Sequence, residues 1–192
     1  MLTRTHFLVS VFLLTSSVVA AEQWWKQGMG GERNYRKFAV NDLSIDVPTN
    51  WQPLVVAAPT IAAFSKDTNA SVSISRERFE HPVLFNELFT KYETQLARDA
   101  APAATDLAAI VVEHYTLGRM LRMEYSGPDP VPPRRGSPRP FRFIHFVIPA
   151  GSSVYRIVCG ARADEFAKLY APTFARMMDS LTIASATKPG LL

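Results

Sequence analysis

The sequence predicts an α+β domain with a central antiparallel sheet and helices packed on both of its faces. Runs of β-branched and aromatic residues recur through residues 37–183, separated by turn-forming residues, and these runs predict strands. Two stretches, beginning near Pro82 and Asp164, instead repeat apolar residues at helical spacing. Successive strands with one helix midway and one at the end favour an antiparallel sheet covered by helices over alternating βαβ units.

The N-terminus predicts a cleavable secretory signal peptide over residues 1–21. Arg4 precedes an apolar core over residues 7–14, and the segment ends in small residues at Ala20 and Ala21. The core is about half the ~20 residues that a bilayer-spanning helix needs. We therefore expect export to the periplasm, with no integral membrane segment after cleavage. A buried N-terminal helix is the alternative.

Residues 22–36 form a glycine-containing lead-in, whose Trp24 and Trp25 we expect to pack on the domain rather than stack on a ligand. Two strand pairs follow. Residues 37–40 and 43–47 flank Asn41 and Asp42, which suit a tight hairpin turn. Residues 60–65 and 70–76 form the second predicted hairpin, and the latter segment alternates apolar and serine residues, as a strand with one polar face does.

In the middle of the chain, the spacing of apolar residues changes from that of a strand to that of a helix and back again. One helix face from Pro82 to about residue 100 carries Phe85, Leu88, Phe89, Tyr92 and Leu96. Four strands are predicted next, over residues 108–117, 119–126, 141–149 and 153–161. The third has large apolar side chains at both odd and even positions, so it needs cover on both faces.

A second helix is predicted from Asp164 to Ser180. Asp164 is placed to cap its start, and Pro172 predicts a kink or a restart inside it. Residues 181–183 can add a short strand, and residues 184–192 form a polar tail that we expect to be disordered.

The order of these landmarks resembles the PsbP-like superfamily, and within it the bacterial periplasmic DcrB-like proteins. The matching pieces are the opening at Phe38–Trp51, the strand at Phe64 and Ser65, the mid-chain helix, the long strands and the ending at Met177–Leu181. The resemblance covers about residues 37–183 and implies a PsbP-like α/β/α sandwich, used mostly to bind other proteins. It transfers no functional residue, and fold analogy alone is a weak basis for function.

The charge of the chain argues against one class of function, nucleic-acid binding, and its cysteine content limits how the fold can be stabilised. The 21 Lys and Arg residues outnumber the 17 Asp and Glu residues, for a formal net charge of +4. Such a mild excess, without a basic helix or an RNA-binding aromatic pattern, does not predict nucleic-acid binding. The single cysteine, Cys159, excludes an internal disulfide.

No catalytic constellation is recognisable in the sequence, so we expect no enzyme, no cofactor and no metal site. His81, His114 and His145 follow no metal-ligand or nucleophile spacing. His114 and His145 interrupt apolar strands and are interpreted as half-buried histidines, and Cys159 as a buried small hydrophobe. Glu113 and Glu124, on adjacent predicted strands, are interpreted as cross-strand ion-pair partners of Arg119 and Arg122.

One loop stands out as a candidate contact surface. Residues 126–140 are rich in proline and carry Arg134, Arg135 and Arg139, whose guanidinium groups would project from a stiff backbone. They suit an acidic protein patch, an anionic lipid or a polysaccharide, and the alternative is a solvated connection between two strands.

The sequence thus predicts an exported, non-enzymatic accessory or binding protein of the bacterial cell envelope that contacts an unknown envelope protein. An alternative is a small-molecule or lipid carrier, with a pocket between sheet and helices lined by Phe85, Phe89, Phe174 and Met178. A hydrolase without a familiar motif is the third interpretation. The oligomeric state is left open.

Overall fold

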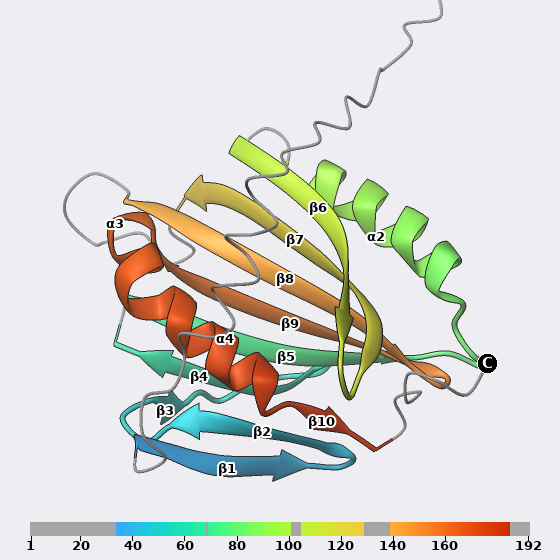
Figure 1. The fold of residues 1–192 in the computed structure, drawn as a ribbon, viewed down its shortest axis with the longest axis horizontal. Helices are drawn as coiled ribbons and strands as arrows, with labels where there is room; N and C mark the ends of the chain where they lie inside the picture. Colours follow the sequence, from blue (N-terminus) through green and yellow to red (C-terminus); the bar gives the residue numbers. More distant parts are fainter. Residues whose placement is uncertain (1–33, 68, 101–104, 129–138, 185–192) are drawn as a thin grey trace, which may run out of the picture.

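Strands dominate the structure, a computed structural model that describes residues 34–67, 69–100, 105–128 and 139–184. A seven-stranded sheet has the order β3-β4-β5-β9-β8-β7-β6, and a three-stranded sheet has the order β1-β2-β10 (Figure 1). The strands are β1 (Tyr35–Val40), β2 (Leu43–Pro48), β3 (Gln52–Pro53), β4 (Thr60–Lys66), β5 (Ala70–Arg78), β6 (Thr105–His114), β7 (Gly118–Pro128), β8 (Pro140–Ala150), β9 (Ser153–Arg162) and β10 (Thr182–Ile183).

Every strand pair is antiparallel, so the predicted antiparallel sheet with few helices is confirmed. Both predicted hairpins form. Val40 pairs with Leu43 across a turn in which Asn41 has a φ of 54°, and Lys66 pairs with Ala70 across Asp67, with a φ of 53°. Asn and Asp tolerate this left-handed conformation better than other non-glycine residues, which is why they occur at these turns.

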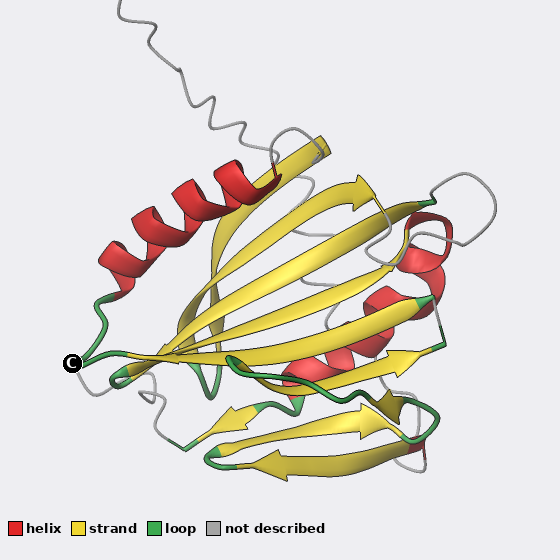
Figure 2. Cartoon of the chain, turned by 180° about the vertical axis from the view of Figure 1, so that it is seen from behind, coloured by secondary structure: helices red, strands yellow, loops and turns green. Residues whose placement is uncertain are grey.

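The helices are α2 (Phe85–Ala100), α3 (Ala163–Glu165), the π-helical turn η2 (Phe166–Tyr170) and α4 (Ala171–Asp179). Alternate residues of β8 belong to two different apolar clusters. Val147 packs in one with Leu88 of α2, whereas Phe146 and Ile148 pack in the other with Phe174 of α4. Since successive residues of a strand point to opposite faces, the two clusters lie on opposite sides of the seven-stranded sheet. From behind, α2 lies in front of the strands and α4 beyond them (Figure 2).

The C-terminal helix is interrupted as Pro172 predicts. A π-helical turn ends at Tyr170, and α4 begins at Ala171 with Pro172 in its first turn, where a missing N–H costs nothing. The predicted cap is wrong. Arg162 occupies the N-cap position of α3 without a side-chain cap, and the carboxylate of Asp164 instead pairs with the Arg162 guanidinium.

Most strand boundaries differ by a few residues from the sequence prediction. The first strand begins at Tyr35 rather than residue 37, and β6 ends at His114 rather than at residue 117. Residues 115–117 turn the chain into β7, and Leu117 is apolar because it is buried in the core from that turn. The two-residue strand β3 was not predicted. The predicted signal peptide, Trp24, Trp25 and residues 185–192 lie outside the described residues.

Candidate functional site

An apolar loop between β3 and β4 is exposed along its whole length. Residues 54–58, Leu-Val-Val-Ala-Ala, are all exposed, with Leu54 at 46% and Val55 fully accessible. Hydrogen bonds hold both ends: Leu54 N donates to Ala63 O at 2.9 Å, and Thr60 N donates to Ala57 O at 3.0 Å. The loop is therefore an ordered projection rather than an unanchored connection.

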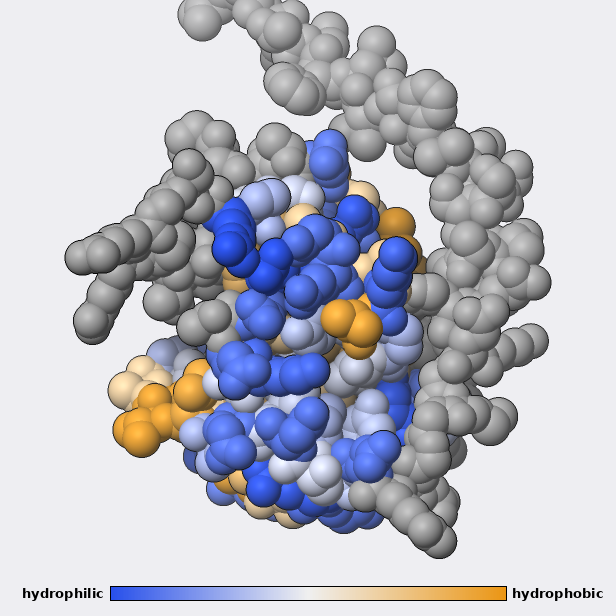
Figure 3. Space-filling model, turned by 90° about the vertical axis from the view of Figure 1, so that its left-hand side faces the viewer, coloured by the Kyte–Doolittle hydropathy of each residue, from blue (hydrophilic) through white to orange (hydrophobic). Residues whose placement is uncertain are grey.

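The surroundings of this loop are polar. The face of the molecule in Figure 3 is largely hydrophilic, and an apolar projection stands out at its lower left, where the β3–β4 loop lies. Monomeric proteins expose single apolar residues freely, but a contiguous apolar patch rimmed by polar groups is typical of an interaction site. We call residues 54–58 the apolar loop below.

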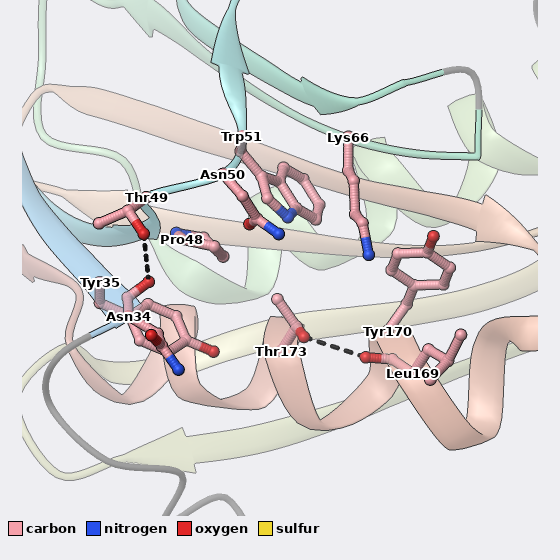
Figure 4. Close-up of a pocket in the computed structure, with 10 residues that line it drawn as sticks. All are labelled: Asn34, Tyr35, Pro48, Thr49, Asn50, Trp51, Lys66, Leu169, Tyr170 and Thr173. Carbon is pink, nitrogen blue, oxygen red and sulfur yellow. Dashed lines mark hydrogen bonds between the residues drawn. The ribbon is translucent and has the colours of Figure 1, made fainter.

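A cavity of about 450 Å³ lies between the β1–β2 hairpin and the C-terminal helix (Figure 4). Aromatic, amide and hydroxyl side chains line it together with one ammonium group; the lining residues are Asn34, Tyr35, Pro48, Thr49, Asn50, Trp51, Lys66, Leu169, Tyr170 and Thr173. Its volume falls within the ~300–1,000 Å³ range of small-molecule pockets.

The rim of the cavity is held by local hydrogen bonds. Thr49 donates from its backbone N to Asn34 O at 2.8 Å, and Thr173 Oγ1 donates to Leu169 O at 3.0 Å, so these groups are already satisfied. Lys66 projects from β4 toward Tyr170 on η2, with its Nζ 5.9 Å from the ring centroid (Figure 4). Within the described ranges, Lys66 forms no ion pair with a carboxylate.

The two tyrosines of the cavity stay protonated at neutral pH. Burial raises the pKa of Tyr35, and burial, followed by the carboxylate of Glu165, raises the pKa of Tyr170. Both phenols are therefore neutral hydroxyl groups in the cavity lining, and the ring of Tyr170 lies beside the Lys66 ammonium. That combination suits a small polar ligand with at least one negative charge.

The predicted contact loop is only partly described. Arg134 and Arg135 lie outside the described residues, while Arg139 is exposed immediately before β8. The positive charge of Arg139 is close enough to Asp164 to help hold the pKa of that carboxyl below its ordinary value, after the larger effect of Arg162.

The structure separates the four residues of the predicted carrier pocket. Phe85 and Phe89 pack with the cluster around α2, whereas Phe174 and Met178 are fully buried in the cluster around α4. The seven-stranded sheet lies between the clusters, so these four side chains do not line one cavity. None of them lines the cavity described above.

Of the nucleophilic and basic side chains considered in the sequence, Cys159, His114 and His145 are buried in the sheet, whereas His81 is exposed between β5 and α2. Cys159 is 1% exposed, and burial raises the pKa of its thiol. Burial lowers the pKa of His114, and it lowers that of His145 to about 4. Among the described residues, no group of three His, Cys, Asp or Glu side chains is arranged to hold a metal ion.

Glu124 on β7 forms the ion pair expected of it, whereas Glu113 on β6 forms no ion pair among the described residues. Glu124 accepts from Arg122 and, at 3.1 Å, from Arg142 of β8, while Glu113 lies opposite Arg119 in the register. Arg119 stacks its guanidinium over the Phe85 ring, 4.6 Å from the centroid. Glu124, Arg122 and Arg119 are therefore structural.

The sequence analysis missed the apolar loop, although a signal for it exists. The five apolar residues stand between Pro53 and Pro59, and proline is excluded from the centre of a sheet, so this run could not be a central strand. The sequence therefore indicates that the five apolar residues form a loop, and whether that loop is exposed or buried depends on the rest of the fold. The cavity had no such signal, because its lining comes from distant parts of the chain.

Among the described residues, no helix has the length and apolar character required to cross a membrane. No protein-family model and no curated protein sequence matches the chain.

Solved structures do match the fold. A crystal structure from Bacteroides thetaiotaomicron aligns with 82% of this chain at 11% identity and a TM-score of 0.53, and this chain spans only 50% of that protein's length. The cyanobacterial PsbP protein CyanoP of Synechocystis aligns with 80% of this chain, over 94% of its own length, at 8% identity and a TM-score of 0.53. A variant of the protein Mog1 aligns with 79% of this chain, over 97% of its own length, at 12% identity and a TM-score of 0.50. These structural alignments show that the chain has a PsbP-like fold. At identities this low, the likeness says nothing about activity.

Proposed function

We propose that this chain is an exported, non-enzymatic accessory protein of the bacterial cell envelope, which binds another protein through the apolar loop. The observation that carries the proposal is the ordered projection of residues 54–58 from a polar surface. Apolar side chains held in water at fixed positions lose little conformational entropy on binding, and their burial stabilises a complex by about 25 cal/mol per Å². The expected partner is a protein with an apolar hollow.

The chemistry of the described residues supports binding over catalysis. A nucleophile needs a base within hydrogen-bond reach and access to substrate. Cys159 is fully buried, and His145 has the Tyr125 hydroxyl, 3.3 Å from its Nε2, as its hydrogen-bond partner. The signal peptide, the periplasmic location and the kinship to DcrB-like proteins remain parts of this proposal that rest on the sequence.

In-cell photo-crosslinking tests the apolar loop. A photo-reactive amino acid at position Val55 is expected to capture one discrete protein, and the same group at Leu84, 62% exposed and far from the loop in sequence, is expected not to capture it. Val55→Asp should abolish the captured product and leave the melting temperature unchanged, because the side chain makes no buried contact. Capture of the same protein from both positions, or of none from Val55, would contradict the proposal.

The arginine-bearing loop forms a second contact in the proposed complex. Replacing Arg134, Arg135 and Arg139 together by Ala should weaken the complex captured from Val55 at unchanged melting temperature, if the partner also carries an acidic patch. An unchanged yield of the captured complex would restrict the contact to the apolar loop.

A second candidate function is the binding of a small anionic molecule in the cavity of Figure 4. The Lys66 ammonium faces this cavity and has no carboxylate partner within the described ranges, which favours a ligand with a carboxylate or phosphate group. Native mass spectrometry of protein isolated from its own periplasm should then show an added small mass, absent from Lys66→Met and retained in Lys91→Met. A spectrum of unliganded protein only would count against this function.

A further inference from the structure

The two sheets of the molecule have four edge strands, and three of them are protected against pairing with another strand. One edge of the seven-stranded sheet is β3, which has two residues, one of them Pro53. One edge of the three-stranded sheet is β10, which also has only two residues. The third, β1, presents the exposed side chains of Arg36 and Lys37. Short length, proline and exposed charge are the usual devices that keep edge strands from pairing.

The fourth edge, β6, has such devices only near its ends, where Asp106 and Glu113 are exposed and a bulge lies between Thr105 and Ala108, and its centre has none. It is ten residues long and pairs only with β7 in the described structure. Residues 107–112, Leu-Ala-Ala-Ile-Val-Val, contain no charge and no proline, and Leu107, Ile110 and Val111 are exposed, with Ile110 at 45%. About every second residue of an antiparallel edge strand points its N–H and C=O groups away from its neighbour, so β6 offers a free row of hydrogen-bonding groups. The strand lies at the upper margin of the sheet in Figure 1.

We propose that β6 pairs with β6 of a second copy of this chain, so that two seven-stranded sheets join into one continuous antiparallel sheet. An antiparallel pair centred on Ile110 sets Ile110 opposite Ile110 of the second copy, Ala109 opposite Val111 and Ala108 opposite Val112. These five pairs are uncharged, and each contains at least one β-branched residue, a type with high strand preference. The interface is isologous, as twofold symmetry requires, and it closes after two copies.

The charges at the ends of β6 are compatible with this register. Glu113 lies near Leu107 of the second copy, and Asp106, in the bulge between Thr105 and Ala108, lies near His114, so this register brings no two carboxylates together. Within its own sheet, Glu113 already faces Arg119 of β7. An edge strand that bound a foreign acidic segment would instead bring like charges together at Asp106 or Glu113.

The first test is the mass of the purified protein in solution, by size-exclusion chromatography with light scattering across a concentration series. The mass is expected to rise from that of one chain to that of two. Ile110→Lys should weaken the association by about tenfold or more, since two ammonium groups would then face each other at the symmetry axis. Leu84→Lys, an equally drastic change at an exposed apolar residue outside β6, should leave the association unchanged.

A cysteine placed at the axis tests the register directly. Ile110→Cys should form an intermolecular disulfide under mild oxidation, since directly opposed residues hold their Cβ atoms about 4.5–5.5 Å apart. Leu84→Cys should not, and the native Cys159 is buried and contributes no background. A protein that stays monomeric at its highest soluble concentration, or a dimer that survives Ile110→Lys and fails to crosslink through Ile110→Cys, would overturn the proposal.

Discussion

Phe143 of β8 and Gly160 of β9 face each other so closely that only a hydrogen atom fits on the β9 side. A Cβ atom at Gly160 would lie 2.8 Å from Cε1 of Phe143. The Phe143 ring has little freedom to retreat, because it stacks on Tyr125 with centroids 5.0 Å apart and packs against Phe141 at 5.9 Å. Gly160 is therefore required by packing.

Gly160→Ala is expected to lower the free energy of unfolding by about 1–3 kcal/mol, the usual cost of overpacking a core. Gly127→Ala is the matched control on β7, because its Cβ would lie 3.6 Å from Phe143 and Tyr125, at ordinary contact distance. Urea denaturation of both variants measures the difference. Equal midpoints for the two variants would contradict the packing argument.

The Asp42 carboxylate joins the two sheets. It accepts a hydrogen bond from the buried Tyr155 hydroxyl of β9 and pairs with Arg76 of β5 at 3.4 Å. Tyr155→Phe is expected to cost about 1–2 kcal/mol in unfolding free energy, and Asp42→Ala more, since it removes the acceptor of the buried Tyr155 hydroxyl and of the half-buried Arg76 guanidinium. The unfolding free energies of the two variants and of the double variant measure the coupling. A smaller loss for Asp42→Ala than for Tyr155→Phe would show that this contact is not the main link.

Acid should destabilise the fold through His145. Burial lowers its pKa from 6.5 to about 4, and the Arg156 guanidinium acts in the same direction. As the pH falls below about 6.5, the unfolded chain therefore binds this proton first, and stability is lost until the pH reaches about 4. The loss from this group is on the order of 3 kcal/mol. His114, whose pKa burial also lowers, adds to it.

The pH dependence of urea unfolding, compared between the native chain and His145→Phe, measures this loss. The variant should show a shallower fall in stability between pH 6.5 and 4, and NMR titration of the imidazole should give a midpoint well below the ordinary histidine value. A His145 imidazole that titrates near 6.5 would refute the linkage.

The thiol of Cys159 should resist modification in the folded protein. It is 1% exposed, and burial raises its pKa, so little of the reactive thiolate is present and reagent has no access. Alkylation by iodoacetamide should be slow in buffer and fast in denaturant. Stoichiometric labelling of the native protein within minutes would show that β9 opens readily.

Local patterns in the sequence were sufficient for the two N-terminal hairpins and for the helices. Asn41 and Asp42 predicted a turn because their side chains tolerate left-handed backbone, and the spacing of Leu88 and Tyr92 predicted the buried face of α2. Pro172 predicted the interruption of the last helix because proline lacks the N–H that a helix interior needs. These features depend on neighbours within a few residues, so one segment carries the whole signal.

Features that depend on which segments meet were decided by the tertiary structure. Phe85 and Phe174 each belong to the apolar face of a helix that the sequence predicts. The sheet separates these two faces, so the four residues of the predicted carrier pocket do not meet. The cavity beside Lys66 brings together residues 34–35, 48–51 and 66 with three residues of the segment 169–173, and no local pattern links them. By itself the sequence determined the fold class, the turns and the helix faces, because these follow from local backbone preference and apolar period. The exposed loop at Val55, the open edge at Ile110 and the cavity were decided by long-range packing, since burial of a side chain depends on what the rest of the chain places over it.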